Sequence, residues 1–118
     1  VWTPWASGAP TTSPVLTRAG AAYDGEDLTN GSWHEFTNAG AVTITIEDDA
    51  TQPMQDNVEF GIRCRGAGGL EIVAVTGVTI VPPKGGTLFM ENGDFAMLKR
   101  VGEDDWKLLG ETVSEDSP

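Results

Sequence analysis

Short runs of alternating apolar and polar residues recur about every ten residues along most of this chain, and this recurrence constrains the fold more than any other feature. The run at 41–47 is the clearest case, with Val42, Ile44 and Ile46 on one face. Gly, Pro, Asn or Asp bounds each run, and these residues favour turns. No window of about 11 residues holds an apolar helical stripe free of Gly or Pro. The pattern predicts an all-β fold, a compact antiparallel β-sandwich or barrel.

The alternation also predicts where the strands lie and which residues point inward. In the run at 58–65, Val58, Phe60, Ile62 and Cys64 fall on the inward side. Asn92-Gly93 has the sequence of a tight hairpin turn. We expect no helix longer than a turn. The expected strands cover residues 33–37, 41–47, 58–65, 70–75, 78–81, 87–90, 95–100 and 106–109.

The length of 118 residues is that of one domain. Residues 1–20 carry three prolines and no sustained period, so we expect an extended N-terminal arm there. Residues 21–112 are expected to form the β-sandwich domain. Residues 113–118 are expected to be an acidic tail.

The expected arm holds large apolar side chains, which a free linker rarely carries. Trp2, Trp5, Val15 and Leu16 are therefore candidate subunit contacts. Two other interpretations remain open for the two tryptophans: they fold back onto their own domain, or they belong to a tag or cloning remnant.

The charge balance excludes two classes of partner. Lys and Arg number 7 against 18 Asp and Glu, a net charge of −11. Such a surface repels phosphate, so we expect no nucleic-acid partner and no docking on anionic membranes. No apolar run approaches the roughly 20 residues that span a bilayer. The single cysteine, Cys64, rules out an intrachain disulfide.

Residues that carry chemistry are sparse. His34 is the only histidine and is expected on the polar face of its strand, while Cys64 is expected to be inert core filler. Asp24, Glu26 and Asp27 match a calcium loop only loosely. The Gly-rich run at 66–69 precedes a strand, so it lacks the helix N-terminus of a phosphate loop. We expect no catalytic residue, no cofactor and no metal, and therefore no enzyme.

Three stretches together carry a resemblance to a known family. They read FTNAGAVTITI (36–46), VTGVTIVPPKGGTL (75–88) and AMLKRVGEDDWKLLG (96–110). In their order and spacing, residues from about 21 to 110 resemble a β-structured module of tailed-bacteriophage virion proteins, of the tail-fibre and capsid-decoration type. The resemblance implies a trimeric, non-catalytic structural domain. The Pro- and Trp-rich arm lies outside it.

The leading hypothesis is a virion structural protein that decorates or cements the phage capsid through contacts of the arm and the sandwich edges. It would be made in the bacterial host cytoplasm and lie on the particle surface. Its partners would be copies of itself, as a trimer, and the major capsid protein or other virion proteins. The alternative is a tail-fibre or distal tail adhesion module, with Tyr23, Trp33 or Phe89 as a sugar platform. A non-viral carbohydrate-binding sandwich is a third hypothesis.

Overall fold

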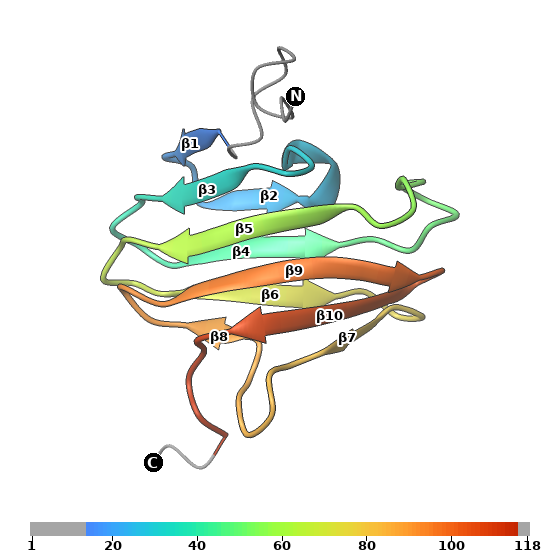
Figure 1. Cartoon of the computed structure of the whole chain (residues 1–118). Coiled ribbons are helices and arrows are strands. Elements are labelled where there is room, and N and C mark those ends of the chain that lie inside the picture. The colour runs from blue at the N-terminus through green and yellow to red at the C-terminus, as the bar shows by residue number, and fades with distance from the viewer. Residues whose placement is uncertain (1–13, 116–118) are drawn as a thin grey trace, which may run out of the picture.

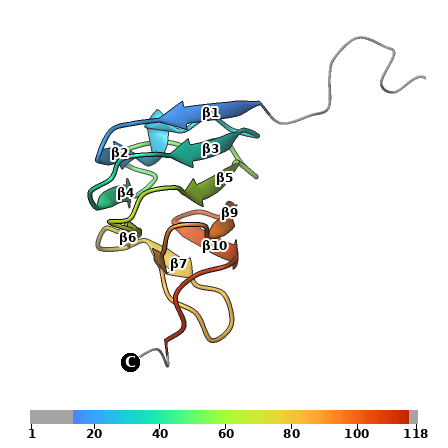
Figure 2. The same ribbon diagram turned by 90° about the vertical axis from the view of Figure 1, so that its left-hand side faces the viewer.

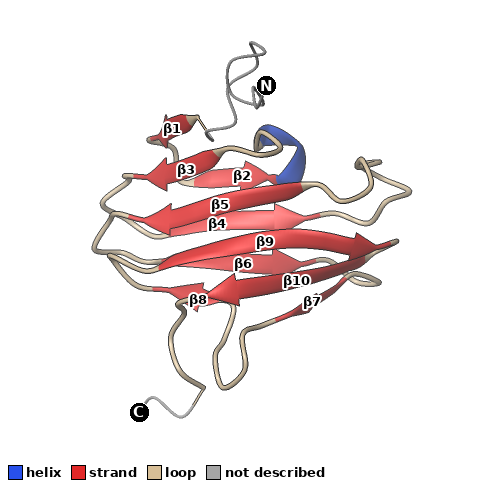
Figure 3. Cartoon of the chain, in the orientation of Figure 1, coloured by secondary structure: helices blue, strands red, loops and turns tan. Residues whose placement is uncertain are grey.

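The computed structural model describes residues 14–115, which are nearly all strand and turn (Figures 1 and 3). The one helical element in this range is a 3₁₀ turn, η1 (Gly25–Asp27). The all-β expectation is confirmed. The strands are β1 (Val15–Arg18), β2 (Ala22–Asp24), β3 (Trp33–Phe36), β4 (Val42–Ile46), β5 (Glu59–Cys64), β6 (Leu70–Ala74), β7 (Thr79–Val81), β8 (Phe89–Met90), β9 (Phe95–Gly102) and β10 (Asp105–Gly110).

The strands form two facing sheets. The larger sheet has the order β1-β3-β5-β9-β10-β7, and the smaller has the order β2-β4-β6-β8. Figure 2 shows the two layers nearly edge-on, with β1, β3 and β5 on one side and β2, β4 and β6 on the other. Each sheet therefore has an inner face toward the other sheet and an outer face away from it.

The chain passes from one sheet to the other at each connection from β1 to β9. As a result β1 pairs with β3 and β3 with β5 in parallel, and β2–β4 and β4–β6 do the same in the smaller sheet. The first six strands thus form three stacked coils. Strands β8 and β9 then close the stack with antiparallel pairing to β6 and β5.

The expectation of a purely antiparallel arrangement is wrong for this coiled half, and β7 also pairs in parallel with β10. Alternation along a strand shows which residues share a face, but it is the same for either strand direction. Alternation therefore does not distinguish a turn that leads to the opposite sheet from a hairpin turn within one sheet.

The core lies between the inner faces and follows the predicted alternation. Val42, Ile44 and Ile46 of β4 are buried, as are Phe60 and Ile62 of β5. Cys64 is buried with them, as expected. Its neighbours in the core include Phe36, Leu70, Ile72, Met90, Leu98, Trp106 and Leu108.

The expected strands are all present, with ends that differ by at most two residues from those predicted, whereas β1 and β2 were not expected. β1 lies inside the range expected as an arm, yet it is the edge strand of the larger sheet. Residues 113–115, expected as tail, hydrogen-bond to the segment before β9: the Val113 N–H donates to the Phe89 carbonyl and the Glu115 N–H to the Gly85 carbonyl.

Candidate interaction face

A row of apolar residues crosses the outer face of the six-stranded sheet, perpendicular to the strands. The pairing register aligns one residue from each of five neighbouring strands. All five occupy outward positions, because their sequence neighbours on each strand point into the core. We call this set the apolar row: Val15, Trp33, Gly61, Met97 and Leu109.

An aromatic pair sits on the middle of this row. The rings of Trp33 and Phe95 stack with centroids 4.0 Å apart and planes 12° from parallel. Between their strands lies Gly61, where a Cβ atom would be 3.3 Å from the Trp33 Cα and 3.4 Å from the Phe95 ring. A larger residue at Gly61 would therefore crowd the pair. Glycine here lets two large rings lie flat across the sheet surface.

Charged side chains flank the apolar row on both sides. On one side Glu35 accepts a hydrogen bond from Arg65 at 2.7 Å and lies 3.7 Å from Arg63. Burial would raise the pKa of Glu35, but hydrogen bonds from Trp33 and Arg65 and the nearby Arg63 charge hold it below its usual value. Glu35 therefore remains an anion held in place by its neighbours.

The opposite flank carries a second ion pair and a further lysine. Lys99 donates to the Glu59 carboxylate at 2.9 Å. Lys107, its cross-strand neighbour on β10, donates to the Pro82 carbonyl at 2.9 Å. Each flank thus holds both a carboxylate and at least one cation.

Four of the seven Lys and Arg residues, namely Arg63, Arg65, Lys99 and Lys107, lie on this outer face. Of the other three, Arg18 donates to the Asp27 carbonyl, Arg100 points between the sheets and Lys84 is in a turn. The face therefore has a positive surplus in a chain whose net charge is −11.

The structure places the predicted contact residues differently. Trp2 and Trp5 lie outside the described residues. Val15 is 65% exposed and begins the apolar row. Leu16 alternates to the inward side of β1 and is half-buried.

The three aromatics considered as a sugar platform lie on different parts of the molecule. Trp33 is on the apolar row. Tyr23 packs edge-on against Phe36, with centroids 5.3 Å apart, beside the core. Phe89 is exposed on β8, at the edge of the other sheet. The structure does not bring them together.

His34 is buried on the inward side of β3, so the expectation that it lies on the polar face is wrong. The reason is that both ring nitrogens find partners: Nδ1 donates to the Gly61 carbonyl at 2.9 Å, and Nε2 accepts from the Thr29 N–H at 3.0 Å. A neutral imidazole so bonded is compatible with the core. Burial lowers the pKa of His34.

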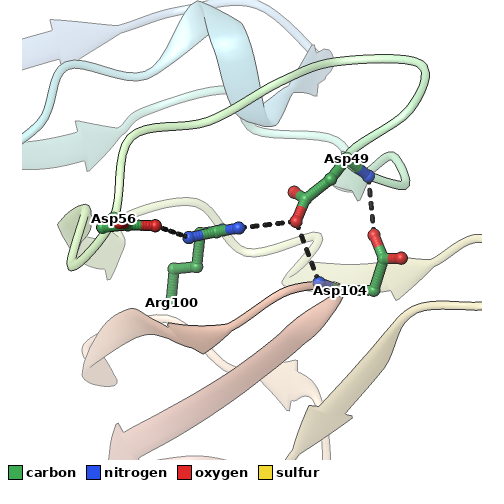
Figure 4. A network of polar contacts seen from close by, with 4 residues as sticks. All are labelled: Asp49, Asp56, Arg100 and Asp104. Atoms are coloured by element: carbon green, nitrogen blue, oxygen red, sulfur yellow. Dashed lines mark hydrogen bonds and ion pairs between the residues drawn. The ribbon is translucent and has the colours of Figure 1, made fainter.

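A second polar cluster ties two loops together at one end of the sheets (Figure 4). The inward-pointing Arg100 donates to the Asp49 carboxylate at 2.6 Å and to Asp56 at 2.8 Å. Asp49 and Asp104 each accept the other's backbone N–H, at 3.0 and 2.6 Å. Asp104 has a positive φ of 53°, which these bonds stabilise in the β9–β10 turn.

The electrostatics of this cluster are those of a structural clamp. The hydrogen bond from Arg100 lowers the pKa of Asp49, and the same bond raises the pKa of Arg100. Both groups are thus held in their charged forms, and neither is poised to transfer a proton near neutral pH.

The carboxylates around η1 form a turn. The Asp24 N–H donates to the Asp27 side chain at 2.8 Å, across the 3₁₀ turn that contains Glu26. Within residues 14–115, no group of three or more His, Cys, Asp or Glu is arranged to hold a metal ion. In the same range no helix has the length and hydrophobicity that crossing a membrane requires.

Comparison with known proteins gives no match: no protein-family model fits the chain, and neither a curated protein nor a solved structure is significantly similar to it.

Sequence reasoning missed most of the apolar row. Alternation places Gly61, Met97 and Leu109 outside the core, but as single exposed residues on separate strands. Only the register aligns them with Val15 and Trp33. The one signal available in the sequence was Gly61, a glycine in the middle of an otherwise well-formed strand. Such a glycine often marks a place where another group lies close to the strand backbone.

Proposed function

We propose that this chain is a non-enzymatic structural protein of a phage particle, which decorates or cements the capsid surface by protein–protein contact. In this proposal the two facing sheets are a β-sandwich that serves as a rigid support. The outer face of its six-stranded sheet makes a protein–protein contact on which assembly depends, and Trp2 and Trp5, which lie outside the described residues, are proposed as further contacts. The virion context rests on the sequence resemblance; the mode of action rests on the outer face.

The observation that carries the proposal is the apolar row. It runs across five strands, and its two ends are well exposed, Val15 at 65% and Leu109 at 54%. Contiguous apolar residues rimmed by charged ones are the usual anatomy of a protein contact surface. Burial of apolar surface there would contribute roughly 25 cal/mol per Å² before ordering costs.

The tail-fibre adhesion module remains the second candidate, because the Trp33–Phe95 pair is aromatic and lies on an outer face. Sugar-binding platforms use such rings. Here Phe95 already covers one face of the Trp33 ring. The charged side chains on the two flanks are already paired with one another, as Arg65 is with Glu35 and Lys99 with Glu59. These features favour a protein partner over a sugar.

The test is incorporation into particles. Leu109→Asp places a charge on the apolar row, and Val101→Asp is its matched control, since Val101 is 57% exposed on the same sheet but lies off the row. We expect Leu109→Asp to reduce the copy number per purified particle at least about tenfold, while Val101→Asp leaves it unchanged. Quantitative mass spectrometry of purified particles measures this.

Circular dichroism of both variants checks that they fold. Equal incorporation of Leu109→Asp and the wild type would contradict the proposed contact face. Absence of the wild-type chain from all particles would contradict the virion role. Loss of host-cell adsorption with normal capsid strength would favour the adhesion module.

A further inference from the structure

The occupant of the outer face can be argued from its charge pattern. We propose that a second copy of this chain docks there, outer face to outer face, around a two-fold axis parallel to the apolar row. This inference rests on the proposed function: the outer face joins two copies of the chain, and the chain is incorporated into the particle as this pair. It concerns the purified chain and so can be tested without particles.

Charge explains why two copies would meet at this face. Each copy carries a net charge of −11, so most orientations of two copies repel. The outer face gathers Arg63, Arg65, Lys99 and Lys107 around three carboxylates on its strands, Glu35, Glu59 and, at the start of β10, Asp105. With four cations against three carboxylates, this face repels a second acidic copy less than the chain's overall charge of −11 would.

The register then selects the orientation. Arg63 and Glu59 lie on β5 on opposite sides of the apolar row, each two residues from Gly61. A two-fold axis along the row exchanges the two flanks and leaves each strand opposite itself. Arg63 of one copy then faces Glu59 of the other, twice by symmetry.

The same operation stacks the apolar rows on each other. Met97 faces its copy, and Gly61, with the Trp33 and Phe95 rings lying across it, faces its copy at the centre. A two-fold axis along the strands and through β5 would instead oppose Arg63 to Arg63. The observed pattern therefore favours the axis along the row.

The size of the face is sufficient for a weak dimer. Strands about 4.8 Å apart that rise about 3.3 Å per residue give a face of roughly 20 by 20 Å. Two such faces would bury on the order of 1,000 Å², close to the lower bound for a specific interface. We therefore expect a concentration-dependent dimer with a dissociation constant roughly in the micromolar range.

The experiment is sedimentation velocity and equilibrium on the purified full chain, up to about 0.5 mM. Arg63→Glu would set Glu against Glu59 of the partner, and Glu59→Arg would set Arg against Arg63. We expect each single variant to weaken dimerisation at least about tenfold. The double variant Arg63→Glu/Glu59→Arg restores the pairing with its charges exchanged, so we expect it to recover dimerisation.

A monomeric wild type at all concentrations would overturn the inference, as would a closed trimer or failure of the double variant to recover when it is folded. If the single variants prove unstable, Leu109→Asp tests the apolar part of the same interface, with Val101→Asp as its control. Loss of the dimer in Leu109→Asp but not in Val101→Asp supports the inference. Equal dimerisation of the two variants overturns it. A chain that dimerises as expected but is absent from particles would contradict only the proposed function. A chain found on particles but monomeric in solution would contradict only the dimer.

Discussion

His34 links a turn to a neighbouring strand in its neutral form, and this makes the protein's stability depend on pH. Its pKa in the folded chain is lowered from 6.5 by burial. Above pH 6.5 the imidazole is neutral in both states and its stabilising contribution is complete. As the pH falls below 6.5, the unfolded chain binds a proton that the folded chain resists, so the free energy of unfolding decreases until the pH passes the lowered pKa.

The measurement is urea unfolding at about pH 7.5 and about pH 5.5, a window above the titration of most carboxylates. We expect a lower midpoint at the acidic pH. His34→Leu should be less stable at both pH values, because Thr29 loses its acceptor and Gly61 its donor, but its midpoint should change much less between them. An equal change in both proteins would show that another group is responsible.

The two carboxylates that contact Arg100 should contribute unequally to stability. The Asp49 side chain is 16% exposed and also accepts the Asp104 N–H, whereas that of Asp56 is 91% exposed. Asp49→Ala leaves the Arg100 charge without its more buried partner, and we expect a loss of about 2–3 kcal/mol in the free energy of unfolding. Asp56→Ala should cost less than about 1 kcal/mol.

Chemical denaturation of both variants measures this difference, and equal losses would contradict the clamp as described. Sequence alone did not single out this cluster. The carboxylates at 48–49 and 103–105 read as solvated turns, and Arg100 as the last residue of a predicted strand. Their meeting depends on the β9–β10 turn approaching the loop after β4, which no local pattern specifies.

At the scale of elements, alternation succeeded wherever a strand had one buried face and turn residues at both ends. Val42 to Ile46 and Phe60 to Cys64 are the clearest cases. β1 was missed because Pro14 precedes it and only one of its four residues, Leu16, packs inward with an apolar side chain. Strand partners were not predictable, since parallel pairing joins segments separated by a whole coil.

The pairing of β1 can be tested with proline. Trp33 and Thr37 donate to the carbonyls of Pro14 and Arg18, so by alternation the Leu16 N–H faces β3 and the Thr17 N–H faces away. Leu16→Pro should therefore destabilise the protein by about 2 kcal/mol more than Leu16→Ala, which controls for the lost side chain. Thr17→Pro should cost less than about 1 kcal/mol.

Thermal or urea unfolding ranks the three variants. If Thr17→Pro proved as damaging as Leu16→Pro, the described register of β1 on β3 would be wrong. If both were neutral, β1 would contribute nothing to the stability of the sheet.

At the scale of the whole molecule, the dominant property is the excess of 18 acidic over 7 basic residues. Their mutual repulsion destabilises the compact state, and salt screens it. We expect the melting temperature to rise by a few degrees between about 10 mM and about 500 mM NaCl. Glu103→Gln/Asp105→Asn, which neutralises two exposed carboxylates in one turn, should raise the melting temperature at low salt and reduce the gain from salt.

Calorimetry of the two proteins at both salt concentrations provides the measurement. A melting temperature that falls with added NaCl would mean that ion pairs such as Lys99–Glu59 outweigh the repulsion.

The passage of the chain between sheets at each connection has a consequence for how the protein is made. Among consecutive strands, only β9 and β10 pair with each other in the part of the chain that the structure describes. A nascent chain leaving the ribosome therefore cannot complete a hairpin until its last strands emerge. Synthesis is followed by slow, non-local assembly, and a product truncated before β9 would expose the unpaired edge of β5 to aggregation.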